Sequence, residues 1–413
     1  MREKRRVVIT GLGVVSPIGN GKERFWDALV RGENGVKKIR SFDTRLYKTH
    51  YGGEVKDFKP EKYIRNIKVP SYCRSTQLAM VASRLAVEDS GMGKVLEEKA
   101  ERERCGVIVG STTQDPKLGE RYVLIWAKRG YENTPVQLTK TLNWFTVGLA
   151  NSIARELNIS GLSMSIPAAC AAGNYTIGYA FDLIKAGRLD TVLAGGTDPM
   201  NQLVYAGFNR LMAMAPQKCQ PFDRNRKGLI VSEGAGVLVL EELEHARRRK
   251  AGIYAEVISY GLGCDAYHST GLHPEGLGII NAVKMALGRA GLNITDIDYI
   301  NAHGTGTPLN DRIETKVIKK IFGSRAKKIP ISSIKSMIGH TMGAASAIEA
   351  VACSLIIRYG IIPATINYVT PDPECDLDYV PNRPRKQKVS IVLSNSFGFG
   401  GNIGVLVIGR FNG

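Results

Sequence analysis

Residues 7–13 read V-V-I-T-G-L-G, and residues 257–263 read V-I-S-Y-G-L-G. Three further kinds of segment recur in the same order: a helix ending in glycine (85–91 and 285–291), a strand followed by a Ser/Thr/Gly-rich loop (105–110 and 299–302), and a closing apolar strand (236–240 and 404–408). One match of this kind arises easily by chance, but four in one order predict a duplication. We therefore expect two α/β halves, 1–252 and 253–413, each with a β-branched sheet and covering helices.

The composition indicates a globular chain with a large core. It has 413 residues, 44% of them hydrophobic, and no apolar stretch approaches the roughly 18 residues that cross a bilayer. The basic tip 1–6 leads directly into the first strand, so we expect no signal peptide and no membrane span. The seven cysteines are scattered and form no C-x-x-C pair, which argues against a disulfide framework and a zinc site. These features predict a cytoplasmic protein.

The net charge of +18 predicts an acidic partner. Both a nucleic acid and an acidic carrier protein fit such a surface. The basic residues are spread along the chain, however, and only 247–250 form a tight run, at the end of a predicted helix. Because no nucleic-acid-binding motif is visible, we expect a protein partner and no nucleic acid.

Cys170 lies in the run S-I-P-A-A-C-A-A-G-N, between an apolar strand (162–166) and a helix of small residues (171–186). A helix that is apolar on all sides belongs in the protein interior. Its N-terminus presents unpaired N–H groups that favour negative charge, and hence the thiolate. If the helix dipole contributes ~2 kcal/mol, about half of the thiol is ionised at pH 7, a fraction that burial reduces. Cys170 is thus a candidate nucleophile.

Two histidine segments follow predicted strands in the second half. His303 lies in N-A-H-G-T-G-T-P, whose glycines allow the backbone to approach a ligand closely. His340 ends the run S-S-I-K-S-M-I-G-H, five residues after Lys335. A single histidine is more often structural than catalytic. Because ligands of α/β proteins usually bind at the carboxyl ends of strands, we expect Cys170 and both histidines to line one site.

These residue types match the formation of a carbon–carbon bond between two thioesters. A thiolate accepts an acyl group, and loss of CO2 from a malonyl thioester then produces an enolate, whose oxygen needs hydrogen-bond donors in a dry cavity. Two neutral histidines supply both donors, and the Lys335 cation disfavours protonation of His340. A cysteine peptidase would instead need one base histidine and an orienting Asn or Asp.

A glycine-rich loop, S-N-S-F-G-F-G-G at 394–401, follows the predicted strand 389–393. Its glycines free backbone N–H groups to point at an anion. The N–H groups of Cys170 and Phe399 would then form an oxyanion hole. The alternative is a glycine-rich hairpin that joins two core strands.

Together these motifs resemble those of a β-ketoacyl-[acyl-carrier-protein] synthase, over essentially the whole chain. The resemblance is greatest to the elongating synthase II type and includes the opening V-V-I-T-G-L-G-V-V-S-P-I-G and the run P-F-D-R-N-R-K-G-L-I-V-S-E-G-A-G. It implies a thiolase-like fold, a five-layered αβαβα sandwich of two similar halves, usually in a homodimer and with neither a metal nor an organic cofactor. It also implies that an acyl chain held on Cys170 condenses with malonyl-acyl-carrier-protein in fatty acid elongation.

The resemblance also assigns roles to single residues. Cys170 resembles the nucleophile, His303 and His340 the decarboxylation donors, and Lys335 the residue that supports them. Phe399 resembles the gating aromatic whose N–H shares the oxyanion hole. The remaining matches are the contacts to the carrier's phosphopantetheine (Thr270, Thr305 and Thr307), a glutamate that supports the catalytic residues unless it is solvated (Glu349), and the cations that dock the acidic carrier (Lys62, Arg65, Lys68, Lys128 and Arg129).

Three departures from the family pattern lie near the implied acyl pocket or the oxyanion loop. The run G-S-T-T-Q-D at 110–115 replaces a glycine-rich apolar stretch, Asn402-Ile403 replaces Thr-Asn, and Ala169 replaces a threonine before the nucleophile. The polar run argues against an ordinary long saturated acyl substrate. A synthase for a specialised acyl or polyketide chain is therefore the alternative, and a non-catalytic carrier-binding subunit is less favoured because Cys170 is present.

Overall fold

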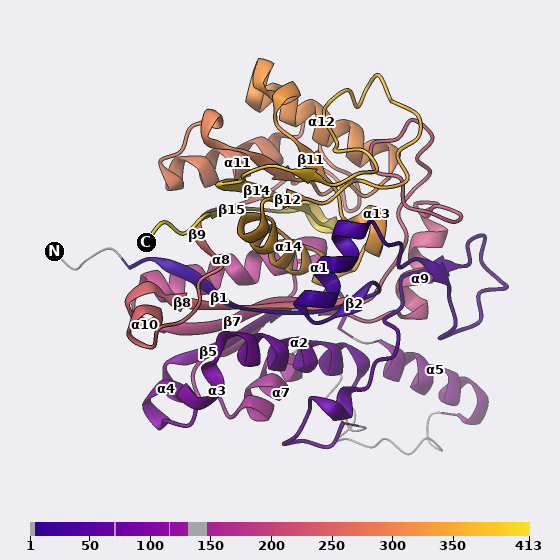
Figure 1. Ribbon diagram of the computed structural model, residues 1–413. Coiled ribbons are helices and arrows are strands. Elements are labelled where there is room, and N and C mark those ends of the chain that lie inside the picture. The colour runs from indigo at the N-terminus through magenta and orange to yellow at the C-terminus, as the bar shows by residue number, and fades with distance from the viewer. Residues whose placement is uncertain (1–4, 70–71, 115, 131–146) are drawn as a thin grey trace.

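Three layers of helices alternate with two layers of strands in this protein (Figure 1). The computed structural model describes residues 5–69, 72–114, 116–130 and 147–413. The strands form the two inner sheet layers, and most of them, such as β1 (Val7–Ser16), β7 (Thr191–Asp198) and β8 (Gly234–Glu242), are buried on both faces. This architecture confirms the αβαβα sandwich predicted from the sequence.

The two halves of the chain are built from corresponding elements. The principal strands are β1 (Val7–Ser16), β5 (Cys105–Gly110), β6 (Ser163–Ile166), β7 (Thr191–Asp198) and β8 (Gly234–Glu242) in the first half, and β9 (Ala255–Cys264), β10 (Tyr299–Asn301), β11 (Ile331–Ser332), β14 (Ile391–Phe397) and β15 (Asn402–Gly409) in the second. The longer helices are α1 (Lys22–Arg31), α2 (Arg74–Ser90), α5 (Lys117–Arg129), α7 (Val147–Leu157), α8 (Ala172–Lys185), α9 (Gln202–Arg210), α11 (Leu277–Ala290), α12 (Pro308–Phe322) and α14 (Ala345–Tyr359). Short elements between them are β2 (Gly19–Asn20), β3 (Lys37–Lys38), β4 (Tyr51–Gly52), η1 (Pro60–Lys62), α3 (Met92–Val95), α4 (Lys99–Glu103), η4 (Ala169–Ala171), α10 (Leu243–Arg248), η5 (Ile294–Asp296), η6 (Gly323–Lys328), α13 (Lys335–Ile338), η7 (Met342–Ala344), β12 (Ile361–Ile362), β13 (Arg385–Lys386) and η8 (Phe399–Gly401).

The order of the strands records the duplication. Among the described residues, hydrogen bonds connect the strands in the order β11-β10-β14-β15-β9-β1-β8-β7-β5-β6. This order is symmetric about the junction of β9 and β1, since β9 corresponds to β1, β15 to β8, β14 to β7, β10 to β5 and β11 to β6. At the junction the two strands are antiparallel, and Val7 lies opposite Val257, the first residues of the two repeated segments. The two halves therefore have the same strand order, and β1 and β9 pair along the edges that would otherwise be exposed.

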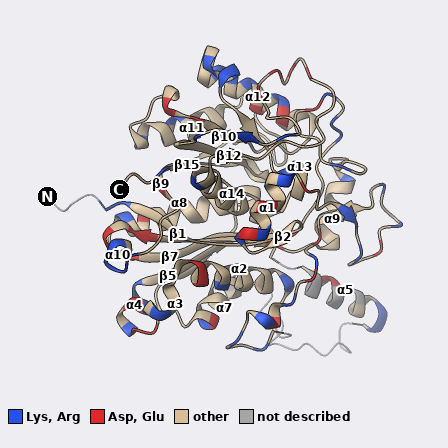
Figure 2. Cartoon of the chain, in the orientation of Figure 1, with Lys and Arg blue, Asp and Glu red and all other residues tan. Residues whose placement is uncertain are grey.

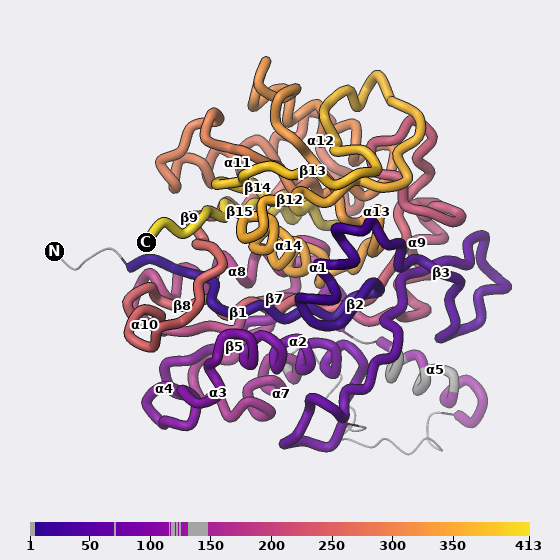
Figure 3. The backbone as a smooth tube through the Cα atoms, in the orientation of Figure 1, coloured from indigo at the N-terminus to yellow at the C-terminus, as the bar shows by residue number. Residues whose placement is uncertain are grey.

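Helices α8 and α14 form the central layer, between the strands of the two halves (Figure 3). Each contacts strands of both halves, and they contact each other. Small residues allow this approach, because a Cβ at Gly173 would lie 2.4 Å from the backbone nitrogen of Ala347. The short helices η4 and η7, which precede α8 and α14, also touch. The N-termini of the two central helices therefore meet at one place.

The outer helices α2 and α11 end as the sequence predicts. Gly91 follows α2 with a φ of 70°, and Gly291 follows α11 with a φ of 66°. Both are left-handed conformations that close a helix and favour glycine.

Within the described part of the chain, one segment has the length and apolar composition to cross a membrane, Met342–Tyr359. The expectation that no stretch approaches this length was therefore wrong. The segment comprises η7 and α14, and 89% of it is buried inside the protein. Its apolar character follows from its place between two sheets, where no helix face meets water.

Candidate active site

Cys170, His303 and His340 line a single cavity of about 410 Å³. They come from three segments that are distant in sequence, since Cys170 lies in η4 before α8, His303 follows β10, and His340 lies between α13 and α14. The three residues form the buried floor of the cavity, with exposed fractions of 5%, 3% and 2%. The centroids of the two imidazole rings are 5.4 Å apart, and the ring planes cross at 83°. The structure thus brings together the three residues singled out in the sequence.

The main chain at Cys170 is held by contacts from the second half. Ala169, directly before it, has a φ of 46°, a left-handed conformation that is uncommon for residues other than glycine. The carbonyl oxygen of Cys170 accepts hydrogen bonds from Ser396 Oγ at 2.9 Å and from Ser346 Oγ at 3.4 Å. Helix α8 begins two residues later, so Cys170 lies at its N-terminal end, as predicted.

Burial brings the ionised fraction of this thiol far below the upper limit of about one half set by the helix dipole. Burial raises the pKa of Cys170 to about 12, although the Lys335 cation opposes the shift, and the Asp198 carboxylate adds to it. The sulfur lies on a buried floor, so the anion loses more hydration than the helix N-terminus compensates. Cys170 is therefore a protonated thiol at neutral pH.

Both histidines are neutral. Burial lowers the pKa of His303 and of His340 well below the usual value, and the charge of Lys335 lowers both further. The backbone N–H of Met342 donates to Nδ1 of His340 at 3.2 Å, so His340 carries its proton on Nε2. Nδ1 of His303 is buried without a hydrogen-bond partner in the described part of the chain. The two rings are thus available to donate hydrogen bonds without carrying charge.

Lys335 lies behind this pair and does not line the cavity. Its Nζ donates to Oε1 of Glu349, and both side chains are 1% exposed. Burial raises the pKa of Glu349, and the Lys335 cation opposes that shift. Glu349 is therefore the buried ion-pair partner of Lys335, and the alternative of a solvated glutamate is wrong.

Two carboxylates of α12 hold the loop that carries His303, and the sequence did not single them out. Glu314 accepts hydrogen bonds from the N–H groups of His303 and Gly304, each at 2.9 Å. Asp311 accepts one from the N–H of Gly306 at 3.2 Å. Burial raises the pKa of Glu314 to about 7. Their spacing of three places both on one helix face, but the same spacing is common on solvated helices.

The loop 398–401 packs directly against Cys170. A Cβ at Gly398 would lie 3.1 Å from the backbone nitrogen of Cys170. Phe399 lines the cavity, is 36% exposed, and has its ring centroid 5.4 Å from that of Phe208. The loop also joins the antiparallel neighbours β14 and β15. It is therefore a hairpin connection, as in the alternative interpretation, and a wall of the site at the same time.

A further carboxylate that the sequence did not single out, Asp198, ties the polar run 110–115 to the site. It accepts hydrogen bonds from Ser111 Oγ at 2.5 Å, from the N–H of Thr112 at 2.9 Å and from the N–H of Gly343 at 2.6 Å. Gly343 lies three residues after His340. The polar run and the segment that carries His340 therefore share one buried anchor, whose partners are too distant in sequence to be recognised from a local pattern.

Among the described residues, the other departures from the family pattern do not themselves line the cavity, but Asn402 contacts a residue that does. Asn402 Nδ2 donates to the carbonyl of Phe399 at 2.9 Å, and Ile403 is fully buried. Gln114 is 2% exposed, has a φ of 59°, and leaves both amide atoms without a hydrogen-bond partner among the described residues. Asp115 lies outside the described residues.

The three threonines line the cavity at different depths. Thr305 is buried and its Oγ1 lies 2.9 Å from Oγ1 of Thr307, whereas Thr270 is exposed at the mouth. The exposed part of the lining also contains Leu211, Met212 and Leu309, so the entrance presents both polar and apolar side chains.

The five cations assigned to carrier docking are exposed, and none lines the cavity. Three belong to the segment around η1, where Arg65 pairs with Glu88 at 3.4 Å, and two form the last turn of α5. Figure 2 shows Lys and Arg on helices at several sides of the molecule, interspersed with Asp and Glu. The docking role of Lys62, Arg65, Lys68, Lys128 and Arg129 stays a prediction.

The chain matches two family models and many curated proteins. "Beta-ketoacyl synthase, N-terminal domain" matches residues 4–246, and "Beta-ketoacyl synthase, C-terminal domain" matches residues 254–369. A 3-oxoacyl-[acyl-carrier-protein] synthase 2 from Coxiella burnetii is 41% identical, over 99% of this chain and 99% of the relative. The tetracenomycin polyketide synthase ketoacyl synthase alpha subunit from Streptomyces glaucescens is 40% identical, over 98% of this chain and 97% of the relative.

Solved structures are similar over the same length. The ishigamide ketosynthase/chain length factor has a TM-score of 0.94 and 39% identity, covering 99% of this chain and 100% of the other. The AntDE:AntF structure, a type II PKS acyl-carrier protein in complex with its ketosynthase bound to the hexaketide, has a TM-score of 0.88 and 34% identity, with the same coverage. From these matches and the fold, the chain belongs to the β-ketoacyl synthase family and is an acyl-transferring condensing enzyme.

Proposed function

We propose that this enzyme performs a decarboxylative Claisen condensation on carrier-bound thioesters in fatty acid elongation. The observation that carries the proposal is the single cavity that joins the Cys170 thiol to two neutral imidazoles, those of His303 and His340. The full-length relative named 3-oxoacyl-[acyl-carrier-protein] synthase 2 supports the same reaction.

In the first half-reaction, the acyl group moves from the carrier's thioester to Cys170. The sulfur attacks the carbonyl carbon, the bond to the carrier's sulfur breaks, and the proton of the Cys170 thiol passes to the departing carrier thiolate. The N–H groups of Cys170 and Phe399 stabilise the oxyanion. The close packing of Gly398 against the nitrogen of Cys170 supports this pairing, because it brings the two N–H groups into one region.

In the second half-reaction, a malonyl-carrier enters the same cavity. Its carboxylate leaves as CO2, and the electron pair of the broken bond forms an enolate whose oxygen accepts hydrogen bonds from His303 and His340. The enolate carbon attacks the acyl carbonyl, and Cys170 leaves as a thiolate that takes up one proton. Lys335 contributes indirectly, because its charge keeps both imidazoles neutral and therefore able to donate. The product is a 3-ketoacyl-carrier two carbons longer.

The proposed partner is an acidic acyl carrier protein, and the enzyme is proposed to act as a homodimer in the cytoplasm. The net charge of +18 favours an acidic partner. The AntDE:AntF structure supports such a partnership, since it contains a ketosynthase with an acyl-carrier protein. In this proposal Thr270, Thr305 and Thr307 contact the carrier's phosphopantetheine arm at the cavity entrance.

Reconstitution with purified acyl-carrier and malonyl-carrier tests the reaction directly. The wild-type enzyme is expected to release CO2 and to give a 3-ketoacyl-carrier, identified by its mass. Alanine at His303 or His340 is expected to lower the condensation rate by about 10²–10³, as loss of an oxyanion donor does, while acylation of Cys170 persists. The exposed His50 serves as the control, and its alanine variant should retain the wild-type rate. A wild-type rate in either active-site variant would remove that histidine from the mechanism.

A polyketide or other specialised acyl chain is the second candidate substrate. The polar run 110–115, which stands in place of an apolar stretch, favours it, and Gln114 in this run has a buried amide without a hydrogen-bond partner among the described residues. The 40% identity to a polyketide ketoacyl synthase agrees with this reading. Acylation rates with matched saturated and 3-keto acyl-carriers, followed by intact mass, distinguish the two. Faster acylation by the saturated chain supports fatty acid elongation, and faster acylation by the keto chain supports the alternative.

A further inference from the structure

The entrance of the catalytic cavity carries one full charge. Among the described residues that line the cavity, Lys227 is the only one with a charged side chain, since both histidines are neutral. Lys227 is exposed, whereas Cys170 at the floor is 5% exposed. Lys227 therefore lies at the exposed end of the same cavity that holds the buried Cys170.

The backbone around Lys227 is fixed against the threonine loop. The N–H of Gly228 donates to the carbonyl of Gly306 at 2.9 Å, between the two threonines of that loop. On the other side, Arg226 is buried, and one of its amino groups donates to the carbonyl of Pro308 at 3.1 Å. Pro308 begins α12 and lines the cavity. Lys227 thus projects from an anchored segment at the same entrance as Thr305 and Thr307.

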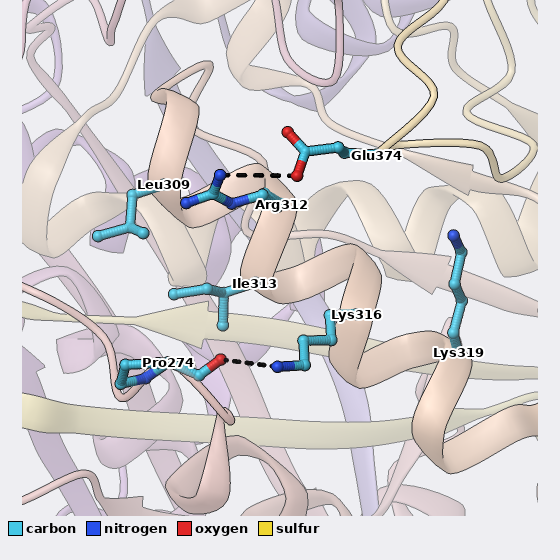
Figure 4. Close-up of a pocket in the computed structure, with 7 residues that line it drawn as sticks. All are labelled: Pro274, Leu309, Arg312, Ile313, Lys316, Lys319 and Glu374. Carbon is cyan, nitrogen blue, oxygen red and sulfur yellow. Dashed lines mark hydrogen bonds and ion pairs between the residues drawn. The ribbon is translucent and has the colours of Figure 1, made fainter.

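Lys227 has no ion-pair or hydrogen-bond partner within the described part of the chain. The neighbouring pocket on α12 is also basic, but its cations have ion-pair partners (Figure 4). There Arg312 pairs with Glu374 at 3.6 Å, Lys316 pairs with Glu275 at 2.5 Å, and Lys319 pairs with an aspartate. The cations of that pocket are already neutralised, whereas Lys227 is free to bind an added anion.

We propose that Lys227 binds the phosphate of the phosphopantetheine arm that carries the acyl and malonyl groups. This inference rests on the proposed function. The thioester end of that arm must reach Cys170, and its anionic end must remain toward the carrier and the solvent. The exposed Lys227 cation at the entrance suits the anionic end of the arm, and the buried Cys170 thiol suits its thioester end. A lysine is a common point-charge ligand for phosphate. Lys227 is therefore a positioning residue that acts on substrate binding and not on the reacting atoms.

An acidic side chain of the carrier is another source of negative charge at this entrance. Small thioesters without a carrier separate the two sources. Acyl-pantetheine and acyl-phosphopantetheine differ only in the phosphate, so the ratio of their kcat/KM values for acylation of Cys170 reports the phosphate contact alone. At low ionic strength the wild-type enzyme is expected to favour the phosphorylated substrate by about three- to fivefold, as is typical of an exposed ion pair.

Lys227→Ala is expected to remove this preference by slowing only the phosphorylated substrate, mainly through KM. Lys227→Arg should restore it, and added salt should abolish it in the wild-type enzyme. Lys316→Ala removes the same charge from the neighbouring pocket and should leave the preference unchanged. A preference that persists in Lys227→Ala, or that is missing from the wild-type enzyme, would overturn the inference. Absence of any acyl adduct in the wild-type enzyme would instead overturn the proposed function, and this inference with it.

Discussion

Burial and the neighbouring Lys335 cation both lower the pKa values of His303 and His340. Both effects have the same sign, because each disfavours the imidazolium. Hydrogen-bond donation to an enolate needs only the N–H that the neutral ring already carries, so the fully buried Lys335 maintains the donors without touching the substrate.

The first prediction concerns the pH dependence of malonyl-carrier decarboxylation. The neutral form of each histidine is the active one, and its pKa lies well below 6.5. The rate of CO2 release should therefore stay level from about pH 8 to about pH 6 and fall only in more acidic solution. A half-maximal rate near pH 6.5 would show that ordinary histidines control the step.

The second prediction concerns the buried pair of Lys335 and Glu349. Lys335→Met leaves an unpaired carboxylate in the core, so it should destabilise the protein by about 3–5 kcal/mol, measured as a lower thermal unfolding midpoint. The double variant Lys335→Met/Glu349→Leu removes both charges and should regain most of that stability. A wild-type unfolding temperature for Lys335→Met would contradict the claim that the Lys335 charge stabilises the buried Glu349.

At the scale of elements, the close crossing of α8 and α14 positions the nucleophile. The third prediction is that Gly173→Ala destabilises the protein by about 1–3 kcal/mol and slows acylation of Cys170, because the new Cβ meets the backbone of α14 at 2.4 Å. Gly207→Ala, in α9, is the matched control, since its Cβ meets nothing within 4 Å and should leave stability equal or slightly higher. Thermal unfolding and acylation rates measure both variants. Equal behaviour of the two variants would contradict the packing argument.

The element pattern was largely predictable from the sequence. The strand predicted at 162–166 is β6 (Ser163–Ile166), and the helix predicted at 171–186 is α8 (Ala172–Lys185). Both follow from local runs of apolar and small residues. The sequence set only an upper limit on the ionised fraction of Cys170, because the helix position is local information whereas the desolvation depends on what buries the sulfur. The anchors Asp198 and Glu314 were not predictable, because their hydrogen-bond partners come together only in the fold.

At the scale of the whole molecule, the two halves depend on each other. The junction of β1 and β9 covers two strand edges, and α8 and α14 are covered by sheets from both halves. The cavity takes Cys170 from the first half and both histidines from the second. We propose that the duplicated halves, 1–252 and 253–413, therefore fold as one unit.

The fourth prediction follows from this dependence. Fragments 1–252 and 253–413, expressed separately, should show no cooperative thermal transition, because each exposes a central helix that is apolar on all sides. Co-expression should restore a folded complex with condensing activity. A cooperative transition in either isolated fragment, followed by near-UV circular dichroism, would contradict the dependence.

The account as a whole depends on Cys170 as the acyl acceptor. The most direct measurement is the intact mass of the enzyme after exposure to an acyl-carrier, with peptide mapping of the modified site. The wild-type enzyme should gain the mass of one acyl group on the peptide that contains Cys170, and Cys170→Ala should gain none. An undiminished acyl adduct on Cys170→Ala would contradict the account.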